Sequence, residues 1–339
     1  MAQTGIVVGL DNGGTTNNAT VLDQSGEFLV ATLVETPSRV REGPAVAVTA
    51  LVEALDAILV RVGATRSDVR AVGLDTPGPA SADGVISSKG STNFANSTWR
   101  GFDIRGALAH ALGLPVVYHN DGNAAALYAH HAQLGAQSHV RSSVSAIIGT
   151  GLGGGLVQNG RVVDGAAGMA GELGHVHVPM DGLLGPGQPV PRCNCGFAGD
   201  AESVASLTGI ELNLLPYWLT QFEGHELADV EPRTAARLVR GYGERGDPLA
   251  TKIFEQQAMA IGRLFTIVAN ITDPDVYFVG GGVVEAEPHF RDWFLASVAT
   301  STTLREEQAR VASFALVPDR DMAGARGAAI AALATIRDR

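Results

Sequence analysis

Val116-Val117-Tyr118-His119-Asn120-Asp121-Gly122-Asn123 is the stretch that decides the fold. A β-branched run ends here, Asn-Asp-Gly-Asn follows, and an alanine-rich stretch comes next. This order predicts a strand, a turn and a helix, with the carboxylate of Asp121 at the carboxyl end of the strand. Ligands bind at that edge in open α/β sheets. Asn, Asp and Gly also favour turns by themselves. The two similar glycine-rich segments on either side of Asp121 favour the ligand-binding interpretation.

The composition is that of a chain that forms a core. Its 339 residues suit two domains, and 45% of them are hydrophobic against 17% charged. The formal net charge of −11 disfavours binding to a phosphate backbone, so we expect no nucleic-acid partner. Lys89 and Lys252 are the only lysines, and no G-x-x-x-x-G-K-[ST] motif is present. A Walker-type phosphate loop is therefore excluded.

Several features of the sequence predict a cytoplasmic location. Residues 1–5 lack a basic segment followed by an apolar core, so we expect no signal peptide. No apolar run reaches the length that spans a membrane, so we expect no membrane partner. Cys193 and Cys195 have one residue between them, which is not a disulfide framework and fits an intracellular protein better.

Residues 6–35 predict a β-meander of three strands, with the third at 28–35. Its first turn, Asn-Gly-Gly-Thr-Thr at 12–16, offers backbone N–H groups and two hydroxyls to an anion. An ordinary Gly-Gly hairpin is the alternative. Helical spacing at 44–62 and 102–112, with a buried strand at 69–74, completes a first α/β domain.

The second half repeats this plan. A strand at 143–148, the turn 149–155 and a hairpin at 156–163 correspond to residues 6–35. Five glycines among seven residues exceed what a hairpin needs, which favours phosphate binding by backbone N–H groups. Two such halves that face each other predict phosphate-binding hairpins on both sides of a cleft.

Further polar groups follow this second hairpin. Glu172 and His175 lie three residues apart between glycines, which is typical of side chains presented to a small ligand or of a surface turn. Cys193 and Cys195 form a weak metal signal that His175 could strengthen. Asp200 opens a predicted helix, where Asp is a favoured N-cap.

The strand at 275–279 leads into three glycines, 280–282. Such a step lets a flat ligand pack on bare backbone, and it also suits a tight turn between a strand and a helix. A small-residue helix is predicted at 323–337.

Taken together, these segments resemble the ROK family (repressor, open reading frame, kinase) within the actin-like ATPase fold of sugar kinases. Six segments match family motifs in the right order over nearly the whole chain. They are 10–16 (D-x-G-G-T), 75–79 (A-P-G-P), 120–125 (N-D-A-N-A-A), 149–155 (G-T-G-I-G-G-G), 171–175 (G-E-I-G-H) and 193–202 (C-x-C-G-x-x-G-C-x-E). Each motif alone is weak, whereas six in order are specific.

The resemblance implies an α/β protein with the two-domain actin-like ATPase (ribonuclease H-like) fold and a ligand cleft between the domains. The N-terminal domain would comprise 1–120 plus 323–339, and the C-terminal domain 121–322. The implied reaction is ATP-dependent phosphorylation of a hexose, by default glucose to glucose 6-phosphate. A homodimer or homotetramer is expected.

The family's functional residues carry over to positions of this chain that match its motifs. Asp121 would be the general base. The sugar hydroxyls would be bound by Asn93, Asn120, Asp121, Glu172, His175 and Glu202. The phosphates and Mg²⁺ would be held by Asp11, Gly13, Gly14, Thr15, Thr150 and Gly151, and the adenosine would lie against Gly281 and Gly282. Positioning and charge stabilisation, the main needs of phosphoryl transfer, do not require a lysine.

The chain departs from the family in three places. Thr16 stands where the family often has lysine, Asp200 stands where the third zinc cysteine usually is, and the loop between His175 and Cys193 is longer. The resemblance implies a structural zinc ion at His175, Cys193, Cys195 and Asp200. Asp in place of Cys is compatible with this site, because Asp is an allowed, although less usual, zinc ligand.

Two alternatives to a glucose kinase stay open. The loop length leaves an amino sugar or a cyclitol as the acceptor. The family also contains sugar-responsive repressors, which carry a basic helix-turn-helix domain before the first hairpin. Here the first predicted strand starts at Ile6 and the chain is acidic, which counts against a repressor.

Overall fold

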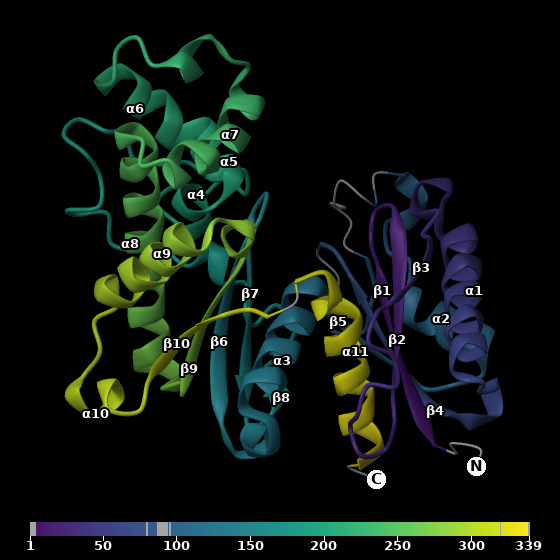
Figure 1. The fold of residues 1–339 in the computed structure, drawn as a ribbon. Coiled ribbons are helices and arrows are strands. Elements are labelled where there is room, and N and C mark those ends of the chain that lie inside the picture. Colours follow the sequence, from purple (N-terminus) through teal and green to yellow (C-terminus); the bar gives the residue numbers. More distant parts are fainter. Residues whose placement is uncertain (1–4, 79–80, 87–93, 95, 319, 338–339) are drawn as a thin grey trace. The chain divides into compact units, whose positions relative to one another are not determined.

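The computed structural model describes residues 5–78, 81–86, 94, 96–318 and 320–337 (Figure 1). The chain divides into two compact units. Unit 1 comprises Met1–His139, Asn159–Ala170 and Pro318–Arg339, and unit 2 comprises Val140–Gln158 and Gly171–Val317. The described residues form two five-stranded sheets. In the described ranges, no helix combines the length and the apolar character needed to cross a membrane.

The first sheet has the strand order β3-β2-β1-β4-β5. Its strands are β1 (Ile6–Asn12), β2 (Thr16–Leu22), β3 (Val34–Pro37), β4 (Val69–Thr76) and β5 (Val116–Asn120). β2 lies antiparallel to both β1 and β3, whereas β4 is parallel to β1 and β5 is parallel to β4. The carboxyl ends of β1, β4 and β5 therefore lie at one edge of the sheet.

The third strand of the meander is shorter than the sequence predicts. Phe28 makes only an isolated bridge to Leu22, and regular pairing starts again at β3. The carboxylate of Asp23 accepts hydrogen bonds from the backbone N–H groups of Gly26 and Glu27, both at 3.0 Å. This side chain organises a local turn in place of a continuous ladder.

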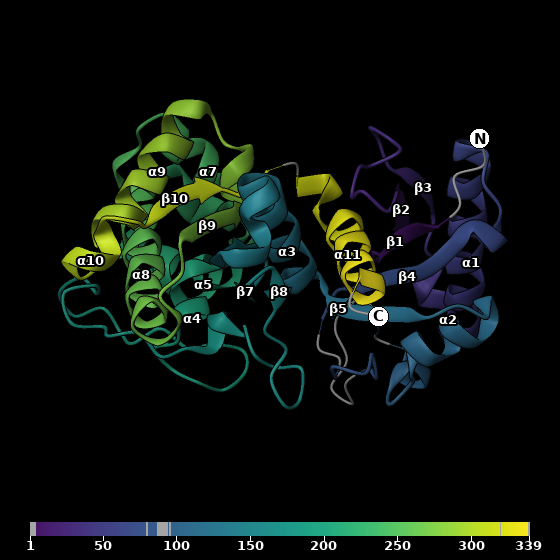
Figure 2. The same cartoon turned by 90° about the horizontal axis from the view of Figure 1, so that it is seen from below.

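Four helices cover the two faces of this sheet. They are α1 (Pro44–Val62), α2 (Ile104–Leu112), α3 (Asp121–Leu134) and α11 (Arg320–Arg337). Successive side chains of β1 point to opposite faces, so that Ile6 and Val8 join the core under α1 and α2 while Val7 joins the core under α11. Figures 1 and 2 show α1 and α2 on one side of the sheet and α11, with α3 beside it, on the other.

Helix α11 packs directly on backbone, because glycines face it. A Cβ atom on Gly9 of β1 would lie 2.0 Å from the carbonyl oxygen of Ala325, and one on Gly73 of β4 would lie 1.8 Å from that of Ala328. In α11 itself, a Cβ on Gly327 would lie 1.8 Å from the carbonyl oxygen of Ala124 in α3. No side chain fits at these contacts without a backbone shift.

The second sheet repeats the plan of the first, as the sequence predicts. Its order is β10-β9-β6-β7-β8, with β6 (Ser142–Ile148), β7 (Leu152–Gln158), β8 (Arg161–Val162), β9 (Val276–Gly281) and β10 (Ser313–Leu316). β6 and β7 form an antiparallel hairpin around a turn at 149–151, which is shorter than predicted because Gly153, Gly154 and Gly155 pair with β6 as part of β7. β9 lies parallel to β6 on its other side. The hairpin β1-β2 with its parallel neighbour β4 has the same arrangement.

Unit 2 is rich in helices. They are α4 (Ala201–Ala205), α5 (Leu207–Gly209), a π-helical turn at Ile210–Leu214, α6 (Leu215–Gln221), α7 (Pro232–Glu244), α8 (Pro248–Thr272), α9 (Pro288–Ser301) and α10 (Glu306–Ala309). α8 packs Phe265 against Tyr277 of β9 with ring centroids 5.3 Å apart, and Tyr277 stacks on Phe314 of β10 at 5.0 Å. These rings anchor the longest helix of the unit to its sheet.

Two acids lie side by side at the edge of the first sheet. Asp11 of β1 is in register with Asp75 of β4, which has no exposed surface. Burial raises the pKa of Asp75 well above its usual range, and the charges of Asp11 and Asp121 raise it further. Within the described part of the chain, no N–H or O–H donor reaches the oxygens of Asp75. Burial therefore favours the neutral, protonated form of Asp75 beside Asp11.

The close contact of α11 predicts the effect of Gly327→Ala. The added methyl group meets a backbone oxygen of α3, so the helices must separate, and we expect a loss of about 2 kcal/mol or more in the free energy of unfolding. Gly241→Ala in α7 is the matched control, because the nearest atom lies 3.5 Å away on a flexible arginine. Alanine there should be neutral or stabilising by up to about 1 kcal/mol. Equal effects of both changes in denaturant titrations would contradict this packing.

The acid pair predicts the effect of Asp75→Asn, which removes the ionisable group and keeps a donor for Asp11. Because folding raises the pKa of Asp75, the folded chain holds a proton that the unfolded chain releases above 3.8. Its contribution to stability falls as the pH rises from there towards the folded pKa. The gain in Tm of this variant over the wild type should therefore be larger at pH 8 than at pH 5. Asp83→Asn, at an exposed acid, should show no such trend, and a gain that is the same at both pH values would refute the prediction.

Candidate active site

Asp121 lies at the junction of β5 and α3. The side chain of Asn120 caps α3 by accepting a hydrogen bond from the backbone N–H of Asn123 at 2.7 Å. Asp121 is exposed, and its Oδ1 accepts from the backbone N–H of Gly122 at 2.8 Å. The positive end of the helix dipole favours a negative charge at this position. The chain therefore presents an exposed carboxylate at the ligand-binding edge, as the sequence predicts.

The turn between β1 and β2 lies at the same edge. The N–H of Gly13 bonds to the carbonyl oxygen of Thr16 at 2.9 Å, and a Cβ on Gly13 would lie 2.8 Å from that oxygen. Thr15 is exposed. Asp11, just before the turn, accepts from Nδ2 of Asn18 at 2.9 Å. A carboxylate, a bare turn and an exposed hydroxyl thus lie together in unit 1.

Unit 2 has an equivalent turn after β6. The N–H of Gly149 bonds to the carbonyl oxygen of Gly151 at 2.9 Å, which closes the turn around the exposed Thr150. Oε2 of Glu202 accepts from the backbone N–H of Leu152 at 2.8 Å, and a Cβ on Gly151 would lie only 2.5 Å from this oxygen. A side chain at Gly151 would therefore displace the carboxylate of Glu202 from this turn.

The glycines at the end of β9 lie beside this turn. Gly281 is in register with Ile148, and a Cβ on it would lie 1.9 Å from the carbonyl oxygen of Ile148. Its φ of 88° also favours glycine. The next residue, Gly282, starts a short 3₁₀ helix and its carbonyl accepts from Arg240 at 2.7 Å. The structure thus brings the predicted nucleotide-binding glycines of unit 2 to one sheet edge.

Glu172, His175 and Glu202 form a polar group in unit 2. Glu172 precedes the 3₁₀ helix Leu173–His175, and burial raises the pKa of its carboxyl group. The nearby His175 lowers that pKa and the charge of Glu202 raises it. A Cβ on Gly174 would lie 3.3 Å from the Cβ of Glu202. Gly174 therefore packs closely against Glu202, and His175 and Glu202 both influence the charge of Glu172.

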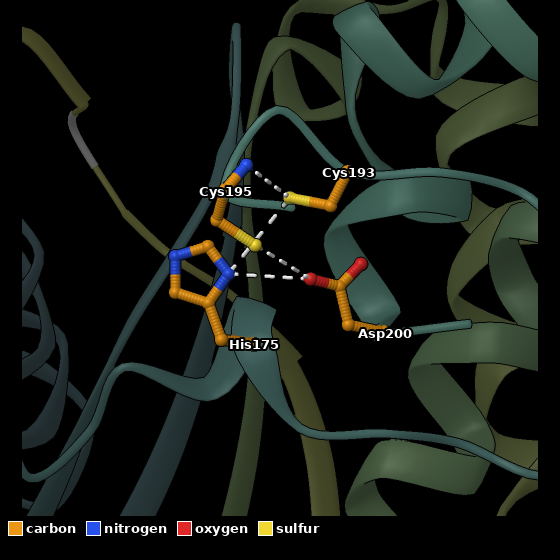
Figure 3. A group of neighbouring side chains, drawn as sticks. All are labelled: His175, Cys193, Cys195 and Asp200. Atoms are coloured by element: carbon orange, nitrogen blue, oxygen red, sulfur yellow. Dashed lines mark hydrogen bonds and ion pairs between the residues drawn. The ribbon is translucent and has the colours of Figure 1, made fainter. Parts of the chain in front are cut away.

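A cluster of His175, Cys193, Cys195 and Asp200 lies next to this group (Figure 3). One donor atom from each lies within 4.8 Å of the others. Oδ2 of Asp200 is 3.3 Å from Nδ1 of His175 and 3.6 Å from Sγ of Cys195, and Sγ of Cys193 is 3.9 Å from the same imidazole nitrogen. Both cysteines are free thiols. The donor set of two sulfurs, one nitrogen and one oxygen suits tetrahedral zinc.

Asp200 combines the two roles that the sequence left open. Its Oδ1 accepts from the backbone N–H of Ser203 at 2.9 Å, which caps α4, and its Oδ2 faces the thiols and the imidazole. Asp200 is fully buried. Burial also raises the pKa of Cys193, whose Sγ donates to Oε1 of Glu202 at 3.2 Å. Glu202 therefore connects the cluster to the glycine-rich turn.

The predicted site residues thus form two groups, one in each unit. Asn93 lies outside the described residues. Sequence reasoning missed the position of Asp75 beside Asp11, because it treated the segment 75–79 only as a family motif. The available signal was an acid directly after the strand predicted at 69–74, which the structure places next to β1. The link between Glu202 and Leu152 was also missed, since nothing local in the sequence indicates it.

Comparisons with known proteins agree with this arrangement. The pattern that describes the ROK family matches residues 7–335. The chain is 33% identical over 310 residues to a glucokinase of Halalkalibacterium halodurans, covering 88% of this chain and 89% of that one. It is 32% identical over 283 residues to an N-acetyl-D-glucosamine kinase of Citrobacter koseri, covering 81% and 83%.

A solved structure is similar over nearly the full length. It is a ROK family glucokinase from Streptomyces griseus in complex with glucose and AMPPNP, with a TM-score of 0.66, 27% identity and coverage of 96% of this chain and 99% of that one. This similarity confirms the actin-like ATPase fold that the sequence predicts. With family motifs, fold and kinase relatives in agreement, the chain belongs to the ROK family and is an ATP-dependent sugar kinase.

Proposed function

We propose that this kinase transfers the γ-phosphoryl group of ATP to the 6-hydroxyl of glucose, with Asp121 as the general base. The observation that carries the proposal is the position of Asp121, exposed at the N-terminus of α3 and at the same sheet edge as the turn after Asp11. The names of the relatives support glucose, because a glucokinase and a glucokinase complex with glucose and AMPPNP are both similar to the chain.

In the proposed reaction, the hydroxyl oxygen of the sugar attacks the γ-phosphorus of ATP, and ADP leaves. Asp121 accepts the proton that this hydroxyl group loses. Asn93, Asn120, Glu172, His175 and Glu202 would orient the sugar. Thr15 and Thr150, with the turn backbone at Gly13, Gly14 and Gly151, would hold the phosphates. Gly281 and Gly282 would lie against the adenosine.

Magnesium fits this site because Asp11 offers a carboxylate, the ligand type that Mg²⁺ prefers. The ion would supply positive charge to the phosphate oxygens when bound. Burial raises the pKa of Asp75 and so favours its neutral form, which reduces the charge repulsion between Asp75 and the carboxylate of Asp11.

An amino sugar is the second candidate acceptor, because an N-acetyl-D-glucosamine kinase is about as similar to the chain as the glucokinase. A cyclitol is a third.

We also propose that the protein forms a homodimer or homotetramer in the cytoplasm, with ATP as its phosphoryl donor.

The function is tested by an assay of ADP release over a panel of glucose, N-acetylglucosamine, mannose and inositol, with the wild type and Asp121→Asn. Glucose should give the highest kcat/KM. Asp121→Asn keeps the size of the side chain but accepts no proton, so kcat should fall about 10²-fold or more while sugar binding is largely retained.

Asp103→Asn is the matched control for this substitution. Asp103 also starts a helix of unit 1, and its carboxylate caps α2 through the N–H of Gly106 at 2.7 Å. Asparagine caps helices equally well, so kcat should not change. A near-normal kcat in Asp121→Asn would remove Asp121 from the mechanism, and a higher kcat/KM for another acceptor would replace glucose.

We further propose that the cluster of His175, Cys193, Cys195 and Asp200 holds a structural zinc ion. Zinc would deprotonate the thiols, which offsets the burial that raises the pKa of Cys193. With Nδ1 of His175 on the metal side, its Nε2 would be left to face a sugar hydroxyl. The metal would then shape the sugar pocket without contact with the phosphoryl group.

Elemental analysis should find about one zinc ion per purified chain. Asp200→Asn and Cys193→Ser should lose it, with a higher KM for the sugar and a lower Tm. Asparagine keeps the cap on α4, so Asp200→Asn separates metal binding from capping. Asp247→Asn is the control, because Asp247 caps α8 and faces His225 but lies near no thiol. Metal-free protein with full activity would reject the zinc site.

A further inference from the structure

A cavity lies in unit 1, and Asp121 is not among the residues that line it. Its volume is about 920 Å³, within the range of sites for small metabolites. The C-terminal half of α3 and the part of α11 from Arg326 to Arg337 line it, together with the turn after β2 and the turn between β7 and β8. We call it the arginine cavity, after Arg161, Arg326 and Arg337 in its wall.

The lining of this cavity differs in charge from the rest of the chain. It includes three arginines and two histidines, and none of the 19 described residues that line it is acidic. The whole chain has 35 acidic residues against 24 Lys and Arg. Asp23, in the adjoining turn, directs its carboxylate to the N–H groups of its own turn. The cavity is therefore a region of positive potential in an acidic protein.

Arg326 is held in place on the cavity wall. Its Cζ lies 4.6 Å from the ring centroid of Phe28 and 5.6 Å from that of Tyr128. Its Nη1 donates to the hydroxyl of Tyr128 at 2.9 Å, and its Nη2 donates to the carbonyl oxygen of Ala31 at 3.1 Å. Stacking on both rings fixes the guanidinium group before any ligand binds, which lowers the entropic cost of binding.

Arg337 brings a second positive charge to the same space. Its Nη2 donates to the carbonyl oxygen of Gln24 at 2.7 Å. Burial lowers the pKa of His131 to about 4, and the charge of Arg337 contributes to that shift. His131 is therefore neutral at pH 7, and the field of Arg337 reaches the imidazole in the cavity wall.

The cavity is separate from the candidate active site. Asp121 is the first residue of α3, and His131 lies ten residues later on the same helix, which corresponds to about 15 Å along the axis. Asp121 does not line the cavity, and Tyr128, the first residue of α3 that does, lies seven residues after it.

We propose that the arginine cavity binds a small organic phosphate. Guanidinium groups match the oxygens of phosphate, and a phosphomonoester carries close to two negative charges at pH 7. The rings of Phe28 and Tyr128 and the apolar residues of α11 provide a surface for the organic part. The inference rests on unit 1 alone and not on the identity of the sugar that is phosphorylated.

The test is calorimetric titration of the full-length chain with glucose 6-phosphate, inorganic phosphate and glucose. The titrations with glucose 6-phosphate and with inorganic phosphate contain an excess of glucose and AMPPNP, which blocks binding at the candidate active site. We expect one equivalent of glucose 6-phosphate to bind and inorganic phosphate to bind more weakly. Glucose should bind equally well to the wild type and to a variant that lacks arginines of the cavity.

The double variant Arg161→Gln/Arg337→Gln should weaken glucose 6-phosphate binding about tenfold or more, because two charged partners are lost. Its kcat and KM should stay at the wild-type values. Arg70→Gln, at an exposed arginine of β4 outside the cavity, is the matched control and should bind normally.

No binding with the active site blocked, or equal binding by the double variant, would overturn the site. Equal affinity for inorganic phosphate would overturn the organic part of the proposal. A failure of the proposed glucose kinase reaction would appear in the ADP-release assay and would leave the difference between the arginine variants unchanged.

Discussion

The contact between α11 and bare backbone is the constraint on which the candidate active site depends. Gly9 and Gly73 let the helix lie against β1 and β4, and Gly327 lets it lie against α3. The C-terminal helix thereby joins the strand that carries Asp11 to the helix that begins at Asp121. A methyl group at any of these contacts moves backbone rather than a side chain, so the relative positions of the two acids depend on them.

The same edge concentrates negative charge. Asp11, Asp75 and Asp121 end or follow neighbouring strands, and burial makes ionisation of Asp75 unfavourable. A phosphoryl-transfer site gathers still more negative charge when a nucleotide binds, so cations and backbone N–H groups must offset it. We propose that glycine-rich turns supply these N–H groups in this chain. A cavity with three arginines in its wall lies elsewhere in unit 1.

Local patterns in the sequence predicted much of this structure. The strand and the helix around Asp121, both glycine-rich hairpins and the helices at 44–62 and 102–112 depend on residues that are close in sequence. The turn predicted between that strand and helix is absent, because α3 begins at Asp121, directly after β5. The short β3, the carboxyl pair of Asp11 and Asp75, and the arginine cavity depend on register and on segments far apart in the chain, which periodicity does not encode. Asp200 shows both cases. Its helix cap follows from the local sequence, whereas its position beside His175 and Cys195 was predicted only from the resemblance to the ROK family.

The central claim is that Asp121 takes the proton from the sugar hydroxyl. The most direct measurement is a crystal structure of the chain with glucose and an unreactive ATP analogue. We expect a carboxylate oxygen of Asp121 within about 3 Å of the 6-hydroxyl oxygen of glucose, and that hydroxyl oxygen should be in line for attack on the γ-phosphorus. A complex in which another side chain holds that hydroxyl and Asp121 points away from it would contradict the account.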